Sequence, residues 1–207
     1  MVESGRTSGS TREASRGARL LRAIRYHVRA SLGLPVRLET ADRIVLEEVI
    51  LPDFAARPDI ERVLFVGCAP FTRHYETIFA GCDFRTIDPV PERSRYGSKH
   101  HIVDGLEHLG RHVAAGSLDL IVCNGVFGWG LDERAVCEAA FEACATALRP
   151  RGAFVLGWND VAAHRPFPPE TLAALRRFRA VEFAPLGAAR HLTATRNRHT
   201  YDFYERV

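Results

Sequence analysis

Long apolar segments are missing from this sequence of 207 residues. No run of eighteen apolar residues occurs, so we expect no transmembrane helix, and the N-terminal residues lack the apolar stretch of a signal peptide. The five cysteines are an odd number and form no Cys-x-x-Cys pair, which is typical of free thiols inside the cell. We therefore expect a cytoplasmic protein without a membrane partner.

Lysine is almost absent, because Lys99 is the single lysine beside 27 arginines. This bias is typical of a GC-rich genome and favours a bacterial source rather than a phosphate-binding design. Residues 1–37 hold eight arginines and two glutamates, a net charge of +6, so the rest of the chain carries −3. A mildly acidic body gives no electrostatic argument for binding a nucleic acid, and we expect none.

The chain divides into three parts with different patterns. Residues 1–15 are small and polar, which predicts a disordered leader. Residues 16–58 contain two helical patterns, at 16–32 and 40–56. The first is amphipathic and arginine-rich, and it either packs on the domain, closes over a site or lies on a membrane surface. Residues 59–207 then suit one domain.

Strand-like and helical runs alternate in this domain, which predicts a parallel, doubly wound sheet. The final strand is different, because a polar loop at 187–198 leads into it without a helix, and a short loop favours antiparallel pairing. We therefore predict a Rossmann-like α/β fold with seven strands, parallel except for the last. The predicted strands are 62–66, 84–87, 100–103, 118–123, 152–158, 178–183 and 199–207, and the helical patterns between them are 73–80, 105–114, 133–148 and 169–176.

The carboxyl ends of parallel strands are where ligands bind in such sheets. The candidate site is therefore made of the residues that follow each strand. These are Gly67, Cys68 and Ala69 after the first, Asp88 and Pro89 after the second, Asp104 and Gly105 after the third, Asn124, Gly125 and Val126 after the fourth, and Gly157, Trp158, Asn159 and Asp160 at the end of the fifth.

Asp88 is the most informative of these residues. It lies 21 positions after Gly67, and a carboxylate at that place can accept hydrogen bonds from both hydroxyls of a ribose. Asp104 repeats the pattern one strand later, where an acid could meet the amino group of an adenine. Each aspartate has a structural alternative as a turn residue, because Pro89 follows the first and Gly105 the second.

These features together resemble the class I S-adenosylmethionine-dependent methyltransferases, in particular the small-molecule, type 11-like branch. Further motifs of that family are SLDLI at 117–121 and LRPRG at 148–152, and the resemblance covers residues 62–207. It implies S-adenosylmethionine as cofactor, S-adenosylhomocysteine as product, and a last strand inserted beside the fifth. It also implies roles for Asp88 at the ribose, Asp104 at the adenine and residues 124–130 at the methyl-bearing end.

The first loop departs from the family pattern, acid-x-Gly-x-Gly-x-Gly. Phe65 stands at the acid position, which removes a carboxylate often found near the amino group of the methionine. Ala69 and Phe71 replace the second and third glycines, and Pro70 removes one amide donor. Phe71 must either point away from a ligand or stack on another group. These departures motivate the alternative of a non-catalytic binding or regulatory protein.

Three other readings have less support. A nicotinamide-dinucleotide enzyme would need Gly-x-Gly-x-x-Gly, of which only Gly67 is present. A metal site is not expected, because His100 and His101 are neighbours on a strand and point to opposite faces. Cys68 is more consistent with loop packing than with a nucleophile.

The predicted function is transfer of a methyl group to an O, N or C atom of a small molecule. No catalytic residue is assigned, although His74, Tyr75, His100 and His101 are candidates in the neighbourhood. Phe127 and Trp129 either surround the sulfonium or pack beneath the following helix. A homodimer is compatible with the sequence, which does not identify the acceptor.

Overall fold

The computed structural model describes residues 26, 28–29 and 36–207. The predicted leader at 1–15 lies outside the described residues. The predicted helix at 16–32 is described only at Tyr26, Val28 and Arg29, which are helical. In the described part of the chain, every helix is too short or too polar to span a bilayer.

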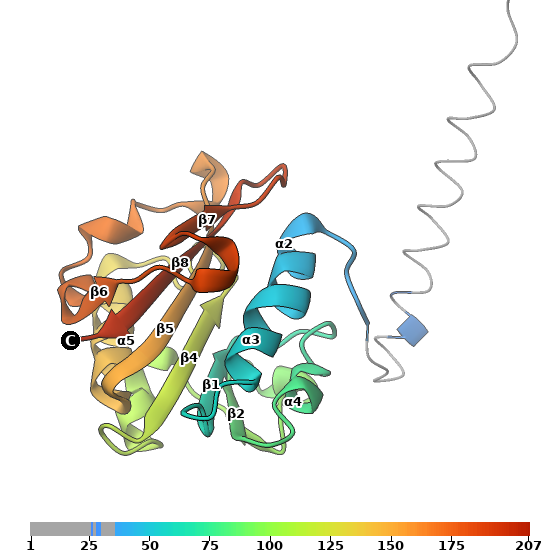
Figure 1. The fold of residues 1–207 in the computed structure, drawn as a ribbon, viewed down its shortest axis with the longest axis horizontal. Helices are drawn as coiled ribbons and strands as arrows, with labels where there is room; N and C mark the ends of the chain where they lie inside the picture. Colours follow the sequence, from blue (N-terminus) through green and yellow to red (C-terminus); the bar gives the residue numbers. More distant parts are fainter. Residues whose placement is uncertain (1–25, 27, 30–35) are drawn as a thin grey trace, which may run out of the picture.

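One mixed sheet of eight strands forms the centre of the domain, in the order β3-β2-β1-β4-β5-β8-β6 (Figure 1). Neighbouring strands from β3 to β5 are parallel, and β8 lies antiparallel beside β5, which confirms the predicted topology. The strands are β1 Arg62–Val66, β2 Asp83–Ile87, β3 His100–Ile102, β4 Leu118–Asn124, β5 Leu148–Asn159, β6 Phe178–Ala180, β7 Arg190–Leu192 and β8 His199–Arg206.

The strand β7, which is part of the sheet but not of the order given above, was not predicted. It lies within the segment read as a polar loop and pairs with β8, whose opposite edge is bound by β5. Its three residues are exposed or half-buried, so its sequence carries no apolar alternation to reveal it. Only the long-range hydrogen bonds to β8 make this segment a strand.

Two of the predicted helices are confirmed. Residues 41–55 form one continuous helix, made of α2 Ala41–Ile44, the π-helical η1 Val45–Ile50 and α3 Leu51–Ala55. We call this segment helix 41–55. The other is α5 Arg134–Ala147.

The remaining helical predictions were too long. The first is reduced to α4 Tyr75–Ile78, and the other two are short 3-10 turns. Gly110 lies inside the second pattern, and a glycine in a helix interior is unfavourable. The 3-10 turns are η2 Pro91–Tyr96, η3 Leu106–Arg111, η4 Ala162–His164, η5 Pro169–Thr171, η6 Ala173–Arg177 and η7 Ala184–Leu186.

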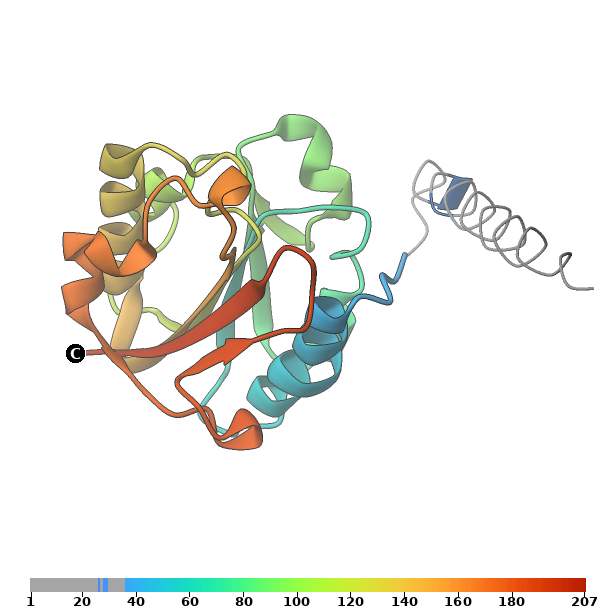
Figure 2. The same ribbon diagram turned by 90° about the horizontal axis from the view of Figure 1, so that it is seen from above.

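The two faces of the sheet bury two separate apolar clusters, because successive residues of a strand point to opposite faces. Leu64 and Val66 pack with α5, whereas Val63 and Phe65 pack beneath helix 41–55. Figure 2 shows these two helices on opposite sides of the sheet. Helix 41–55 is therefore part of the core of the domain.

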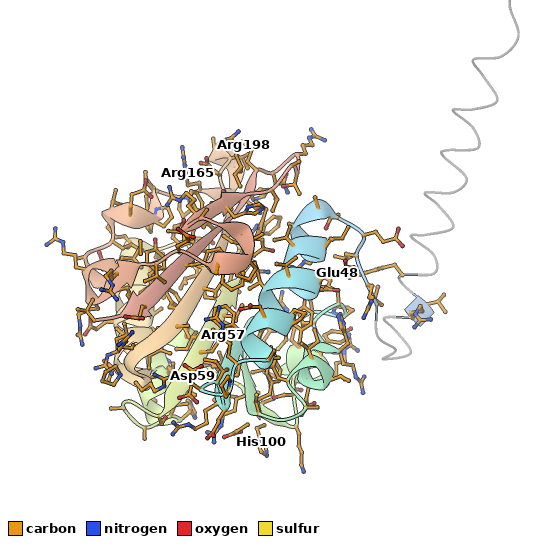
Figure 3. The ribbon with its side chains drawn as sticks, viewed as in Figure 1. Glu48, Arg57, Asp59, His100, Arg165 and Arg198 are labelled. Carbon is orange, nitrogen blue, oxygen red and sulfur yellow. The ribbon has the colours of Figure 1, made fainter. Side chains whose placement is uncertain are left out.

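Labelled side chains mark the two ends of the sheet in Figure 3. Asp59 and His100 lie at the end where the parallel strands begin, and Arg165 and Arg198 lie at the opposite end. Both arginines pair there with Asp160, at 2.5 and 3.6 Å, just after β5. The loops of the candidate site belong to this carboxyl end.

A buried carboxylate joins the strands at their beginning. Asp119 on β4 accepts hydrogen bonds from the N–H groups of Glu61 and Arg62, at 3.1 and 2.8 Å, and from the Arg149 side chain at 2.8 Å. Burial raises the pKa of this carboxyl, but the hydrogen bonds from Arg62, Arg149 and the backbone outweigh burial and lower the pKa overall. Asp119 is therefore a charged tie between β1, β4 and β5.

We predict that Asp119→Ala lowers the free energy of unfolding by about 2–3 kcal/mol, because two backbone N–H groups lose their acceptor. Urea denaturation measures the loss. The matched control is Asp53→Ala, which breaks a half-exposed pair with Arg57 and should cost about 0.5 kcal/mol or less. Equal losses in the two variants would contradict the role given to Asp119.

Candidate functional site

A cavity of about 800 Å³ lies at the carboxyl end of the sheet. It is bounded by the first loop, the loop after β4, the start of helix 41–55 and the segment before β8. The described residues that line it are Leu38, Thr40, Asp42, Arg43, Gly67, Cys68, Ala69, Pro70, Phe71, Thr72, Arg93, Tyr96, Asn124, Gly125, Val126, Trp129, Asn159, Thr195, Arg196, Asn197 and His199.

Gly67 is required where the first loop leaves β1. Its φ of +85° is unfavourable for residues with a side chain, and a Cβ there would lie 2.5 Å from Cγ1 of Val126. The missing side chain therefore lets the first loop approach the loop after β4. These two loops meet where the strand order reverses, between β1 and β4.

The amide groups of the first loop are used within the protein. The Cys68 N–H donates to Asp88 Oδ2 at 2.8 Å, and the Ala69 N–H donates to Thr72 Oγ1 at 3.0 Å. Pro70 has no N–H. The loop therefore provides shape but few donors, which is unfavourable for binding a pyrophosphate and argues against the dinucleotide alternative.

Asp88 is buried, with 1% of its surface exposed. Its carboxylate accepts hydrogen bonds from the N–H groups of Cys68 and Val90, and Arg93 Nη1 lies 3.3 Å from Oδ2. Arg93 is half-exposed and lines the cavity, whereas Asp88 and Pro89 do not. The arginine thus lies between this carboxylate and the cavity.

Asp104 and Gly105 are also absent from the described residues that line the cavity. The Asp104 carboxylate lies 2.7 Å from His112 Nε2 and 2.8 Å from His108 Nδ1, and it accepts the Gly105 N–H. Hydrogen bonds from His112 and His108 hold the pKa of Asp104 well below its usual range. The 3-10 turn η3 brings both histidines to this carboxylate.

The structure therefore brings six of the ten predicted cofactor-binding residues to the cavity lining, and the other four are not part of that lining. The six are Gly67, Cys68, Ala69, Asn124, Gly125 and Val126, and the four are Asp88, Pro89, Asp104 and Gly105.

The aromatic residues at the end of β1 and in the first loop have defined partners. Phe65 is buried beneath helix 41–55, with its ring centroid 5.0 Å from that of Tyr75. Phe71 stacks instead, because the Arg43 guanidinium carbon lies 4.2 Å from its ring centroid. The acid position of the family pattern therefore faces the core rather than the cavity.

Helix 41–55 contributes a charged cluster that sequence reasoning missed. Arg43 Nη1 donates to Tyr75 Oη at 3.0 Å, and this hydroxyl donates to Glu47 Oε1 at 2.9 Å. His74 Nε2 lies 3.2 Å from Glu47 Oε2. The spacing of Arg43 and Glu47 by four residues indicates one helix face, but it does not reveal that this face borders a site.

His199 was missed as well, and it lies between two amides. Its Nδ1 is 2.8 Å from Asn159 Oδ1, and its Nε2 is 2.9 Å from Asn124 Oδ1. Burial lowers the pKa of His199 to about 4, while Asp42 raises it and Arg43 lowers it. The ring is therefore neutral at pH 7.

A neutral imidazole donates from one nitrogen and accepts at the other, so one of the two amides must turn its NH₂ group toward the ring. Asn124 Nδ2 is buried without a partner among the described residues. Turning Asn124 pairs this nitrogen with the ring. The network is therefore built from neutral hydrogen-bonding groups.

The other candidate residues are less suited to chemistry at the cavity. His74, Tyr75, His100 and His101 do not belong to the described residues that line it. Burial raises the pKa of the Cys68 thiol to about 12, which is unfavourable for a nucleophile. Among the described residues, no group of three His, Cys, Asp or Glu side chains is arranged to hold a metal ion.

The two aromatic residues after β4 differ in their surroundings. Phe127 is fully buried and contacts the rings of Phe141, Trp158 and Phe167. Trp129 is 54% exposed, stacks on His164 and lines the cavity. The Phe127 ring therefore packs in the core, which is the packing role predicted as the alternative to a ligand contact. The Trp129 ring is available to a ligand.

A search with the sequence finds no matching protein-family model and no matching curated protein. Solved structures do match. The N-methyltransferase NodS from Bradyrhizobium japonicum aligns over 82% of this chain and 99% of its own, at 17% identity and a TM-score of 0.58.

Two further structures have the same fold with different acceptors. A 1,6-didemethyltoxoflavin-N1-methyltransferase from Burkholderia thailandensis, with S-adenosylhomocysteine bound, covers 100% of this chain and 93% of its own (13% identity, TM-score 0.52). The 16S rRNA methyltransferase RsmC from T. thermophilus covers 76% and 38% (16% identity, TM-score 0.50). The chain therefore has the Rossmann-like fold of S-adenosylmethionine-dependent methyltransferases.

We predict that NMR titration of the His199 ring gives a pKa near 4. Because the unfolded chain binds this proton near pH 6.5, the contribution of His199 to stability is complete above pH 6.5. It is lost as pH falls toward 4, by about 2–3 kcal/mol. The free energy of unfolding of His199→Gln should not show this loss as the pH falls. A ring that titrates near 6.5 would contradict the buried, neutral state.

Proposed function

We propose that this protein is an S-adenosylmethionine-dependent methyltransferase that acts on a small molecule, of the type 11-like branch. The observation that carries the proposal is the cavity itself. It lies where the strand order reverses, and it is bordered by Gly67 and by the loop after β4. Its volume of about 800 Å³ is within the range that holds a cofactor and a small acceptor.

The residue proposed for the adenosine end of the cofactor is Asp88, which lies beside Arg93 of the cavity lining. Asp88 is an acceptor-only carboxylate, which suits a ribose diol, and the exposed Arg93 is displaced when the ribose binds. The six lining residues named above contact the rest of the cofactor, and Pro89 supports the turn after Asp88. The adenine contact of Asp104 and Gly105 stays a prediction, because the Asp104 carboxylate is already paired with His108 and His112.

The far end of the cavity suits a small acceptor. His199, Asn124 and Asn159 offer neutral hydrogen-bonding groups, and Trp129 offers an aromatic surface. A neutral polar site of this kind orients a hydroxyl, an amine or a ring nitrogen. The net charge of −3 on residues 38–207 gives no electrostatic basis for binding a nucleic acid.

The cofactor supplies a methyl group on a sulfonium, and the protein's contribution is to hold the two partners at reacting distance and to exclude water. His199 is neutral at pH 7 but weakly basic, so its main contribution is hydrogen bonding rather than proton abstraction. Many transfers to an already nucleophilic atom need no stronger base.

We predict that S-adenosylhomocysteine binds the purified protein in calorimetry. Asp88→Ala should weaken binding by about 10-fold or more, since it removes the ribose acceptor and the tie to Cys68. Arg93→Gln is the matched control, and it should bind as tightly as the wild type or more tightly. No binding at millimolar ligand would contradict the proposal, and thermal denaturation confirms that each variant is folded.

We also predict methyl transfer from labelled cofactor into a low-molecular-weight fraction of a host metabolite extract. The product should disappear in Asp88→Ala and persist in Asp53→Ala, whose side chain pairs with Arg57 away from the cavity. Binding of the cofactor without any labelled product would favour the non-catalytic alternative.

A further inference from the structure

Four charged side chains are found among the described residues that line the cavity: Asp42, Arg43, Arg93 and Arg196. Arg93 lies beside Asp88, on the side proposed for the ribose. Asp42 and Arg43 lie on the first turn of helix 41–55, and Arg196 lies in the segment before β8. The helix therefore places a carboxylate and a guanidinium together at one border of the cavity.

Arg43 is fixed in place before any ligand binds. Its side chain is only 11% exposed, Tyr75 accepts a hydrogen bond from Nη1, and Phe71 stacks on the guanidinium. Nη2 would lie 3.8 Å from a Cβ at Gly125, so this nitrogen is next to the loop after β4. Nη2 has no hydrogen-bond acceptor within the described part of the chain. A buried, oriented cation with a free donor is suited to bind an anion.

Asp42 lies next to the Arg43 guanidinium but forms only a long ion pair with it. Its Oδ2 lies 3.9 Å from Arg43 Nε, and 19% of its side chain is exposed. The Tyr201 hydroxyl donates to the backbone oxygen of Asp42 at 2.8 Å, which fixes the start of the helix. Asp42 and Arg43 therefore present opposite charges to the same part of the cavity.

The first loop cannot provide these charges. Phe65 occupies the acid position and is buried in the core, and the amides of Cys68 and Ala69 are already paired. A ribose at Asp88 places the remainder of the cofactor across this loop, toward the loop after β4 and the start of helix 41–55. The amino-acid end of the cofactor carries one carboxylate and one ammonium group.

We infer that Arg43 binds the carboxylate and Asp42 the ammonium of this amino-acid end. This inference rests on the proposed cofactor and adds the residues that recognise its charged part. Recognition of that part has moved from the first loop to the first turn of helix 41–55. Tyr75 and Phe71 are positioning residues, because they act through Arg43.

The test compares two ligands that differ only in the amino-acid end: S-adenosylhomocysteine, which has it, and 5′-deoxy-5′-methylthioadenosine, which lacks it. Arg43→Gln should weaken binding of S-adenosylhomocysteine roughly 10- to 100-fold and leave the second ligand within about twofold. Asp42→Asn should weaken the first ligand by roughly 3- to 10-fold.

Arg57→Gln is the matched control, because Arg57 also stacks on a phenylalanine, Phe54, but lines no part of the described cavity. It should change neither affinity. Equal weakening of both ligands by Arg43→Gln, or no weakening of S-adenosylhomocysteine, would overturn the inference while leaving the proposed function standing. Failure of both ligands to bind the wild type would instead overturn the proposed function and, with it, the inference.

Discussion

The hydrogen bond from the Cys68 N–H to the buried carboxylate of Asp88 is the interaction on which the site depends. It ties the first loop to the end of β2 and fixes the turn that begins at Gly67. Because Gly67 has no side chain, Val126 can lie against this turn, and the loops after β1 and β4 meet. The cavity exists because these two loops are held together at the point where the strand order reverses.

Around this junction, the borders of the cavity differ in chemistry for reasons that lie in the core. The cluster beneath helix 41–55 buries Phe65 and Tyr75, and Tyr75 in turn orients Arg43. On the other side, the antiparallel pairing of β8 with β5 brings His199 opposite Asn159. The first arrangement places the charged groups of helix 41–55 at the cavity, and the second places the neutral side chains of His199 and Asn159 there.

Much of the fold could be predicted from the sequence, because strand periodicity and glycine positions are local signals. The succession of strands along the chain, the reversed direction of β8 and the turn at Gly67 follow from such signals, whereas the place of β8 beside β5 was implied by the family resemblance. The pairing of Asp104 with His108 and His112 could not be predicted, since it depends on a 3-10 turn where a helix was expected. Arg43 and His199 were missed because only tertiary packing brings these residues, distant along the chain, to one cavity.

The central claim is that the cavity between the first loop, helix 41–55 and the segment before β8 holds S-adenosylmethionine. The most direct measurement is a crystal structure of the full chain grown with S-adenosylhomocysteine. We predict the ribose at Asp88 with Arg93 displaced, and the amino-acid end beside Asp42 and Arg43. A ligand bound elsewhere, or bound in the cavity with its ribose away from Asp88, would contradict the account.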